Sequence, residues 1–332
     1  MMGMKKASSM ATGSRRVTVL RSGKVVNAFD PWGNPLCTCP PKYSLNPYTG
    51  CSHFCLYCYA TSYIGRRPST PKKRYKERLL YDIAHVINPA FHIDISTSSD
   101  PYPPEEKEYG LTRWTLEQLL PRGFKVLIIT KGALVERDAE LLAGGNAAVT
   151  MTITTMDTWL ASKLEPGAPT PRQRIRALEK LNTYGVPIGI RLDPILPLIN
   201  DSRESVKEVL EAAYSAGARF VVTSTYKAKP DNFRRIIEAF PELEKKYREL
   251  YKIKGERLYG YRYLPVEVRK RILLLVREEA TRLGMEYATC REGFAQLHTA
   301  PSCDGSHLIP IRIKPTSNHG SQSLDKYLEL DR

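Results

Sequence analysis

Residues 186–225 read VPIGIRLDPILPLINDSRESVKEVLEAAYSAGARFVVTST and alternate between apolar and polar stretches. The runs VPIGIRLDPIL (186–196) and ARFVVTST (218–225) are rich in β-branched residues, which favour strands. Between them, SRESVKEVLEAAYSAG (202–217) has helical periodicity and ends at a glycine. Two strands that are apolar on both faces and joined by a helix indicate a parallel sheet covered by helices.

The same alternation extends upstream to about residue 43. In TPRQRIRALEKLNTYG, Ile175, Leu178 and Leu181 recur at helical spacing before Gly185, which predicts the end of a helix. The other predicted strands are SLNPY (44–48), FHIDIST (91–97), KVLIIT (125–130) and AAVTMTIT (147–154), and the other predicted helices are PKKRYKERLLYDIAHVI (71–87), TRWTLEQLL (112–120) and ALVERDAELLA (133–143). The sequence therefore predicts six β/α units, arranged as a doubly wound sheet or a barrel.

The pattern changes on both sides of this region, which divides the chain into three predicted parts. Residues 1–42 form an N-terminal segment with a basic tail, and residues 43–228 form the β/α domain. Residues 229–332 form a C-terminal extension, whose clearest element is the amphipathic helix VEVRKRILLLVREEATRLG (266–284). The last 40 residues contain prolines and glycines and are predicted to be largely irregular, with a short strand.

Three cysteines, Cys51, Cys55 and Cys58, follow the first predicted strand in the stretch GCSHFCLYCYA (50–60). In parallel barrels the loops after the strands carry the chemistry, so this loop is a candidate site. Thiolates at this spacing suit an iron–sulfur cluster, which usually takes four ligands. A structural zinc site also takes four protein ligands, and His53 is the alternative fourth ligand within the loop.

The spacing C-x3-C-x-aromatic-C, with Tyr57 as the aromatic residue, resembles the signature of the radical S-adenosylmethionine (SAM) superfamily. Five segments in order resemble its spore photoproduct lyase-like branch: NPYTGCSHFCLYCYA, DISTSSDPYPPEE, IITKG, LEPGAPTPRQRIRALEKL and RLDPILPLIND. The resemblance implies an α/β fold with a partial (β/α)6 TIM-type barrel, an N-terminal extension, and a helical and irregular C-terminal extension. It covers about residues 45 to 202.

This resemblance also implies a cofactor set and a reaction. The three cysteines would hold three irons of a [4Fe–4S] cluster, and SAM would chelate the fourth. An electron from a donor such as ferredoxin or flavodoxin would cleave SAM, and the resulting 5′-deoxyadenosyl radical would abstract a hydrogen atom from a substrate.

Further site residues follow from the same resemblance. Tyr57 would pack near the adenosyl group, and Ser99 and Lys131 would contact the methionine carboxylate of SAM. An ammonium group suits a carboxylate partner, although Lys131 can also be a solvated charge at a strand end. Lys131 is also one of two predicted catalytic residues.

The second predicted catalytic residue is Tyr59, which resembles a tyrosine on the hydrogen-transfer path and can alternatively be a packing aromatic. Thr154 and Arg191 are candidates for SAM or substrate binding, or else internal hydrogen-bonding groups. The sequence departs from the lyase at Thr97, where the lyase has a cysteine that donates hydrogen to the product radical. Because a hydroxyl is a poorer hydrogen-atom donor than a thiol, this departure argues against splitting of thymine photodimers.

Four more cysteines lie outside the β/α domain: Cys37 and Cys39 before it, and Cys290 and Cys303 after it. They match the ligand count of a second iron–sulfur cluster or a zinc site, with His307 as a spare ligand. The alternative is four unrelated buried thiols. The odd total of seven cysteines argues against a disulfide framework and for a reducing compartment.

The chain has 50 Lys and Arg residues against 35 Asp and Glu residues, a net charge of +15, which favours a polyanionic partner. Two basic stretches, GRRPSTPKKRYKER (65–78) and KKYRELYKIKGERLYGYRY (245–263), can grip phosphates and stack on bases, or can be solvated helix faces. The leading hypothesis is a radical SAM enzyme that modifies or repairs a nucleobase in DNA or RNA. The alternatives are a protein or small-molecule substrate, and a non-catalytic nucleic-acid-binding protein with metal-stapled loops.

No apolar stretch of signal-peptide or membrane-spanning length is evident in the sequence. The sequence therefore predicts a cytoplasmic protein with no membrane partner.

Overall fold

An eight-stranded sheet forms the centre of the computed structural model, which describes residues 20–29 and 34–315. The spatial order of the strands is β1-β2-β5-β6-β7-β8-β9-β12. Their bounds are β1 Val26–Ala28, β2 Tyr43–Leu45, β5 Ile93–Ile95, β6 Val126–Thr130, β7 Ala147–Thr152, β8 Ile188–Ile195, β9 Phe220–Thr225 and β12 Glu286–Thr289. The predicted basic tail lies outside the described residues.

Neighbouring strands of this sheet are parallel, except that β1 pairs antiparallel with β2. The edge strands β1 and β12 do not pair with each other in the described residues, so the sheet is an open, partial barrel. The six predicted strands correspond to β2 and β5 to β9 and are confirmed. A seventh parallel strand, β12, comes from the C-terminal extension and pairs with β9 from Glu286↔Phe220 to Thr289↔Thr223.

The strands are apolar because both faces of the sheet are covered. Every residue of β7 and of β9 is buried, as parallel sheets between two layers require. The helices that follow the strands are α2 Tyr75–His85, α4 Leu111–Leu119, α5 Ala139–Ala143, α6 Thr158–Leu164, α7 Pro171–Thr183 and α8 Arg203–Ser215. Helix α7 begins with a capping box, in which Thr170 and Gln173 satisfy each other's backbone N–H groups, and Pro171 occupies its first turn.

Short elements complete the first half of the chain. They are α1 Thr61–Ile64, α3 Glu106–Tyr109, the ribbon of β3 Tyr48–Thr49 with β4 Thr70–Pro71, and 3₁₀ helices at Leu120–Arg122 and Ala133–Asp138. The 3₁₀ helix at Ala133–Asp138 and helix α5 together occupy one predicted helix.

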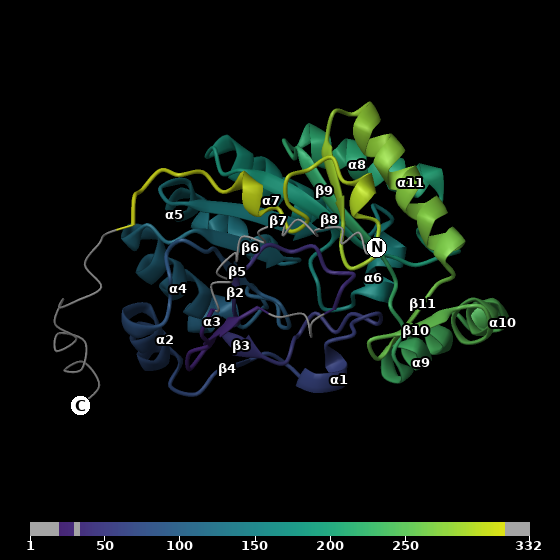
Figure 1. Ribbon diagram of the computed structural model, residues 1–332, viewed down its shortest axis with the longest axis horizontal. Helices are drawn as coiled ribbons and strands as arrows, with labels where there is room; N and C mark the ends of the chain where they lie inside the picture. Colours follow the sequence, from purple (N-terminus) through teal and green to yellow (C-terminus); the bar gives the residue numbers. More distant parts are fainter. Residues whose placement is uncertain (1–19, 30–33, 316–332) are drawn as a thin grey trace, which may run out of the picture.

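The helical part of the C-terminal extension packs at one end of the sheet, on the right in Figure 1. It contains α9 Pro230–Ala239, a 3₁₀ helix at Pro241–Leu243, α10 Glu244–Arg248, a π-helical turn at Glu249–Ile253, the hairpin of β10 Glu256–Leu258 with β11 Tyr261–Tyr263, and α11 Val266–Arg282. Tyr247 and Tyr251 of the second basic stretch are fully buried and pack against Tyr226 and Phe233. These two tyrosines are therefore core residues and cannot stack on bases.

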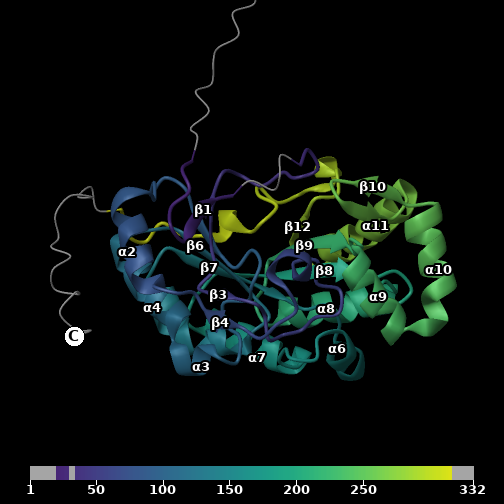
Figure 2. The same cartoon turned by 90° about the horizontal axis from the view of Figure 1, so that it is seen from below.

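The N-terminal segment and the C-terminal tail lie on the same face of the molecule. In Figure 2 the purple N-terminal segment and the yellow tail run along the face opposite to α3, α6 and α7. After β12 the tail has only 3₁₀ turns at Ala295–Leu297 and Ser306–Leu308 among its described residues. Asn146 fixes its end by accepting from the backbone N–H groups of Arg312 and Ile313 at 2.7 and 2.9 Å.

Among the described residues, no helix combines the length and the apolar character that crossing a membrane would need.

Candidate active site

A cavity of about 570 Å³ lies at the carboxyl ends of the strands and brings most of the predicted site residues together. Its lining includes the three cysteines of the loop after β2, the four other cysteines, and Tyr57, Tyr59, Ser99, Lys131 and Arg191. Thr154 is not among the described residues that line it. The arrangement follows from the parallel sheet, because loops after successive parallel strands meet at one edge.

The loop with Cys51, Cys55 and Cys58 is held against the segment that precedes α7. Leu56 N donates to Leu164 O at 2.8 Å, and Gly167 N donates to His53 O at 3.0 Å. A Cβ atom at Gly167 would lie 1.9 Å from Ser52 O, so only glycine permits this contact. The segment LEPGAP therefore forms the support of the cysteine loop.

The three thiols of this loop suit a thiolate-bound cluster. All three are free, and Cys55 is buried. Burial raises the pKa of Cys51 to about 11, and a cation bound beside the sulfur would favour its thiolate form. His53, the alternative fourth ligand, lies with its Nδ1 atom 3.3 Å from an oxygen of Asp100 and not among the sulfurs of a ligand set.

A buried polar network lies beneath the cysteine loop. The hydroxyl of Tyr57 donates to Glu165, which also pairs with Arg174 at 2.5 Å. Burial alone would raise the pKa of Glu165, but Arg174 and then Lys131 hold it below its usual value. Thr154 donates to Glu165 at 3.0 Å, which gives it the internal hydrogen-bonding role that the sequence left open.

The loops after β5 and β6 form a pocket that suits a carboxylate. The side chain of Asn46 accepts from the backbone N–H groups of residues 97, 98 and 99 at 3.1 to 3.3 Å and so fixes the Ser99 loop. Ser99 Oγ is buried and has no hydrogen-bond partner within the described structure. Asp100 accepts from Lys131 N at 2.8 Å and from Thr130 Oγ1 at 2.5 Å, which joins the two loops.

Lys131 reaches across this pocket toward the cysteine loop. Its ammonium lies 5.5 Å from the centre of the Tyr57 ring. Burial would lower the pKa of Lys131, but the nearby Cys55 and Glu165 raise it, so the side chain stays charged. An unpartnered buried hydroxyl on Ser99 and a charged lysine at one place fit the carboxylate of SAM.

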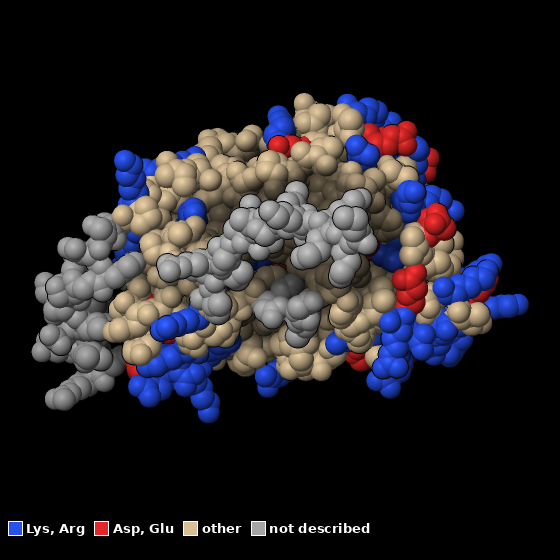
Figure 3. Space-filling view, in the orientation of Figure 1, with Lys and Arg blue, Asp and Glu red and all other residues tan. Residues whose placement is uncertain are grey.

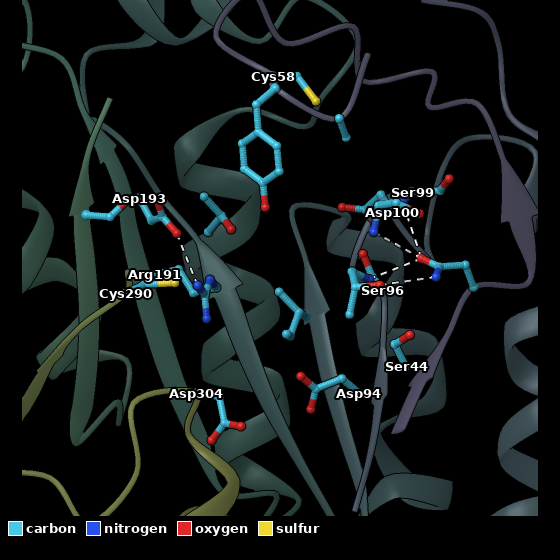
Figure 4. A pocket seen from close by; sticks show the side chains of 18 of the residues that line it. Ser44, Cys58, Asp94, Ser96, Ser99, Asp100, Arg191, Asp193, Cys290 and Asp304 are labelled. Atoms are coloured by element: carbon cyan, nitrogen blue, oxygen red, sulfur yellow. Dashed lines mark hydrogen bonds and ion pairs between the residues drawn. The ribbon is translucent and has the colours of Figure 1, made fainter. Parts of the chain in front are cut away.

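The opposite wall of the cavity comes from β8, β9 and the end of β12. Figure 4 shows Arg191, Asp193 and Cys290 on this wall, facing Ser99 and Asp100 on the other. Arg191 pairs with Asp193 at 3.0 Å, and this carboxylate raises the pKa of Arg191 against the effect of burial. The Arg191 guanidinium therefore presents a fixed positive charge to the cavity.

Tyr59 lies in an aromatic and cationic cluster at the rim of the cavity. The Arg291 guanidinium lies 4.8 Å from the centre of its ring, and the Tyr261 ring meets it edge-on at 5.7 Å. Tyr59 thus lines the cavity while its ring packs against C-terminal residues, and its place on a hydrogen-transfer path stays a prediction.

The floor of the cavity is an ion cluster that joins three distant segments. Lys42 Nζ lies 2.5 Å from Asp94 and 2.7 Å from Asp304, and His92 Nε2 lies 3.2 Å from both carboxylates. His92, Asp94 and Asp304 have the spacing of metal ligands. The Lys42 ammonium already supplies the cation between these two carboxylates, so the cluster is an internal ion network.

This network predicts a pH-dependent stability. Burial lowers the pKa of His92, but its contacts with Asp304 and Asp94 raise it to about 9, above the usual 6.5. The stabilisation is complete below about pH 6.5 and is lost as the pH rises through about 9, and it amounts to about 3 kcal/mol. The free energy of unfolding in urea should therefore differ most between wild type and His92→Asn at pH 6 and least at pH 10. A difference that does not change with pH would contradict this assignment.

Sequence reasoning missed three residues that position the site: Asn46, Asp100 and Glu165. The segments that contain them are NPYTGC, STSSDPY and LEPGAP, respectively. A short polar residue directly after a buried strand was the available signal for Asn46. For Asp100 the signal was the polar run STSSD that follows the apolar strand residues. His307, the spare metal ligand, is engaged elsewhere, because its ring nitrogens contact Ser302 and Glu286 at 2.7 and 2.8 Å.

Residues 45–213 match the family described as the Radical SAM superfamily, and the chain belongs to it. This membership makes the protein a radical SAM enzyme and implies a [4Fe–4S] cluster and SAM as cofactors. It favours catalysis over the non-catalytic binding protein that the sequence left open.

Three relatives illustrate the range of similar chains. An uncharacterized protein of Mycobacterium tuberculosis, Rv2578c, is 28% identical over 291 residues, which is 82% of this chain and 81% of that protein. An uncharacterized protein of Methanocaldococcus jannaschii is 28% identical and covers 67% of this chain and 83% of its own. A radical SAM Nalpha-GlyT isomerase of Pseudomonas phage M6 is 25% identical, over 74% of this chain and 53% of that protein.

The fold is similar to that of spore photoproduct lyase. A mutant of this enzyme with bound AdoMet and dinucleoside spore photoproduct matches with a TM-score of 0.56 and 17% identity, over 74% of this chain and 75% of that one. This likeness confirms the predicted partial barrel.

Proposed function

We propose that this radical SAM enzyme acts on a nucleobase in DNA or RNA. The observation that carries the proposal is a single cavity that joins the cysteine loop, the Ser99 and Lys131 pocket and the charged Arg191 wall. In this proposal the first two parts bind the cofactors, and the third receives the substrate.

The residues of the cavity have distinct roles in this proposal. Cys51, Cys55 and Cys58 hold the cluster, while Ser99 and Lys131 bind the carboxylate of SAM. When bound, these cofactors supply an organic radical that abstracts hydrogen from the substrate. The buried ammonium of Lys131 neutralises the negative charge of this carboxylate. Tyr57, which donates a hydrogen bond to Glu165, closes the cavity against water beside the cysteine loop.

Lys131→Met is expected to weaken SAM binding by about 10- to 100-fold, because a charge-assisted hydrogen bond contributes about 1.5–3 kcal/mol. Lys131→Arg should retain part of the affinity for SAM that Lys131→Met loses. Ser99→Ala should lower the affinity for SAM less than Lys131→Met does. Equilibrium dialysis of labelled SAM against anaerobically reconstituted protein measures the dissociation constant without turnover. Lys163→Met, a lysine that packs on Trp159 outside the cavity lining, is the matched control. An unchanged affinity for Lys131→Met would refute the proposed role.

The distribution of charge supports a polyanionic substrate. Figure 3 shows Lys and Arg side chains on two sides of the central hollow, over α2 and β4 and over α10. On the first side Arg66 and Arg67 are exposed next to the cysteine loop, where they bond to Phe54 O and to Thr49. On the second side the charges are partly neutralised, since Glu244 and Glu249 pair with neighbouring basic residues.

The ligand of a structurally similar enzyme supports the same substrate class. Structures of spore photoproduct lyase contain a dinucleoside spore photoproduct, which is a pair of linked nucleosides. Thr97 stands at the cavity where the resemblance places a thiol in that enzyme, and it exchanges hydrogen bonds with Asn46. We therefore propose a nucleobase substrate other than the thymine photodimer.

Single-stranded oligonucleotides are expected to bind in a salt-dependent manner. Arg66→Ala/Arg67→Ala/Lys73→Ala should reduce the slope of log affinity against log salt by about 2, since each lost phosphate contact on a single strand contributes about 0.7. Fluorescence anisotropy across a salt series measures this slope. Lys207→Ala/Lys270→Ala/Arg271→Ala, which alters exposed residues of α8 and α11, is the matched control. Equal slopes for both variants, or no binding by wild type, would favour a protein or small-molecule substrate.

A further inference from the structure

Four cysteines from three distant segments converge on one wall of the cavity. Cys37 and Cys39 lie between β1 and β2, Cys290 directly follows β12, and Cys303 lies in the tail. The Sγ atoms of Cys39 and Cys303 are 3.5 Å apart, although 264 residues separate them in sequence. Cys37 and Cys290 lie close enough to take part in the same electrostatic group, because Cys39 raises the pKa of Cys37, and Cys290 raises the pKa of both Cys37 and Cys303.

The surroundings of these sulfurs are apolar on one side and cationic on the other. Cys39, Cys290 and Cys303 pack in a small core cluster with Phe220 and Val222, separate from the main core. On the cavity side, Arg191 and Lys42 supply positive charge. Such surroundings exclude water and stabilise thiolates, as a metal centre with four thiolates requires.

A disulfide does not account for this convergence. All four cysteines are free, and a separation of 3.5 Å is far longer than a sulfur–sulfur bond of about 2.05 Å. Two thiolates on one tetrahedral metal ion such as zinc, each about 2.3 Å from the metal, lie about 3.8 Å apart. In a [4Fe–4S] cluster each cysteine binds its own iron, which holds the sulfurs farther apart, whereas in a [2Fe–2S] cluster two cysteines share one iron. The spacing of Cys39 and Cys303 therefore matches two thiolates on one metal ion.

Cys37 and Cys290 must move inward to complete a tetrahedron. No three of the described cysteine sulfurs lie within 4.8 Å of one another. The backbone N–H groups of Cys37 and Cys290 donate to Asn34 O and Thr223 O, both at 2.9 Å, so the movement falls mainly on the two side chains.

We propose that Cys37, Cys39, Cys290 and Cys303 bind a second metal centre, a single Zn²⁺-type ion held by four thiolates. Binding displaces the thiol protons and leaves the oxidation state of the ion unchanged. The ion joins the N-terminal segment to the C-terminal tail beside Arg191 and so fixes one wall of the cavity. The inference does not depend on the identity of the substrate.

Metal content tests the proposal without any assay of activity. Wild type, Cys39→Ser/Cys303→Ser and Cys51→Ser/Cys55→Ser/Cys58→Ser are purified anaerobically, without reconstitution, from cells supplied with zinc and iron. Inductively coupled plasma mass spectrometry should find about one zinc per chain in wild type and in the triple variant, and none in the double variant. Iron should be present in wild type and in the double variant and absent from the triple variant. Zinc that is absent from wild type, or equal in all three proteins, would overturn the proposal, as would a loss of about two or about four irons from the double variant.

Wild-type protein provides a second test that does not require a variant to fold. Mercurial titration should release the zinc as four thiols react, and Co²⁺ in its place should show the visible absorption of a tetrahedral thiolate site. A Cys39–Cys303 disulfide in the anaerobic protein, detected as two missing thiols, would refute the site.

Ser302→Ala, which changes the neighbour of Cys303 but no ligand, should keep its zinc. Loss of zinc from this control together with a change in circular dichroism would mark tail unfolding as the cause.

Discussion

Cys55→Ser is expected to lower the reductive formation of 5′-deoxyadenosine from SAM by at least about 1000-fold, to the level of a protein-free control. Cys55 is buried at the centre of the loop and lies beside Lys131. Without its thiolate the loop lacks one of the three sulfurs that hold the cluster. A loss of this size corresponds to about 4 kcal/mol in the activation free energy. Chromatography of anaerobic reactions with dithionite measures the product.

The control for this experiment comes from the same chain. Cys290→Ser also changes a cavity-lining cysteine to serine but leaves the loop after β2 intact. It should retain the iron of the first cluster and most of the SAM cleavage, although the tail can lose order. Product formation by Cys55→Ser above background, with iron still bound, would refute the assignment of the three ligands.

Arg174→Met is expected to destabilise the fold by about 3–5 kcal/mol. The Arg174 side chain is 1% exposed, and its removal leaves the Glu165 carboxylate buried next to Tyr57 and Cys55. Removing one partner of a buried ion pair costs this much because the remaining carboxylate loses its direct ion pair and keeps only the charge of Lys131 as compensation. Urea denaturation of the apo protein, followed by circular dichroism, measures the change in the free energy of unfolding.

Two further variants show whether the buried charge causes the effect. Glu165→Gln/Arg174→Met should recover part of the lost stability, because neither ion remains. Arg203→Met removes a guanidinium of similar size from α8, where it is half exposed and pairs with Glu278 and Glu279. It should cost less than Arg174→Met, because Arg282 still pairs with the buried Glu279 at 3.0 Å. If the single and double variants at Glu165 and Arg174 were equally unstable, lost packing would be the cause.

Interleaved tyrosines and lysines at 245–263 illustrate a limit of local sequence patterns. The spacing predicted either a base-stacking surface or a charged helix face. Tyr247 and Tyr251 are four residues apart, which places them on one helical face, and the structure turns that face into the core. Arg248 between them stays exposed, so the basic surface survives. Tyr259 is the one described tyrosine of this stretch that stays exposed.

Strand β12 illustrates another limit. Its four residues, EYAT, carry too little apolar pattern to predict a buried parallel strand. The strand exists because α11 returns the chain to the edge of the sheet, where β9 offers unpaired backbone groups. The same return brings Cys290 and Arg291 to the cavity.

The sequence by itself determined the features that depend on neighbours along the chain. Apolar runs of strand length predicted six parallel strands, since a strand covered on both faces must be apolar. The spacing of Cys51, Cys55 and Cys58 predicted a cluster loop, since three thiols in eight residues share one loop whatever the rest does. Only the tertiary structure placed Ser99 opposite Arg191, turned Thr154 toward Glu165 and brought Cys39 next to Cys303. Those contacts arise where the loops of parallel strands and the two terminal segments meet, and no local spacing encodes such a meeting.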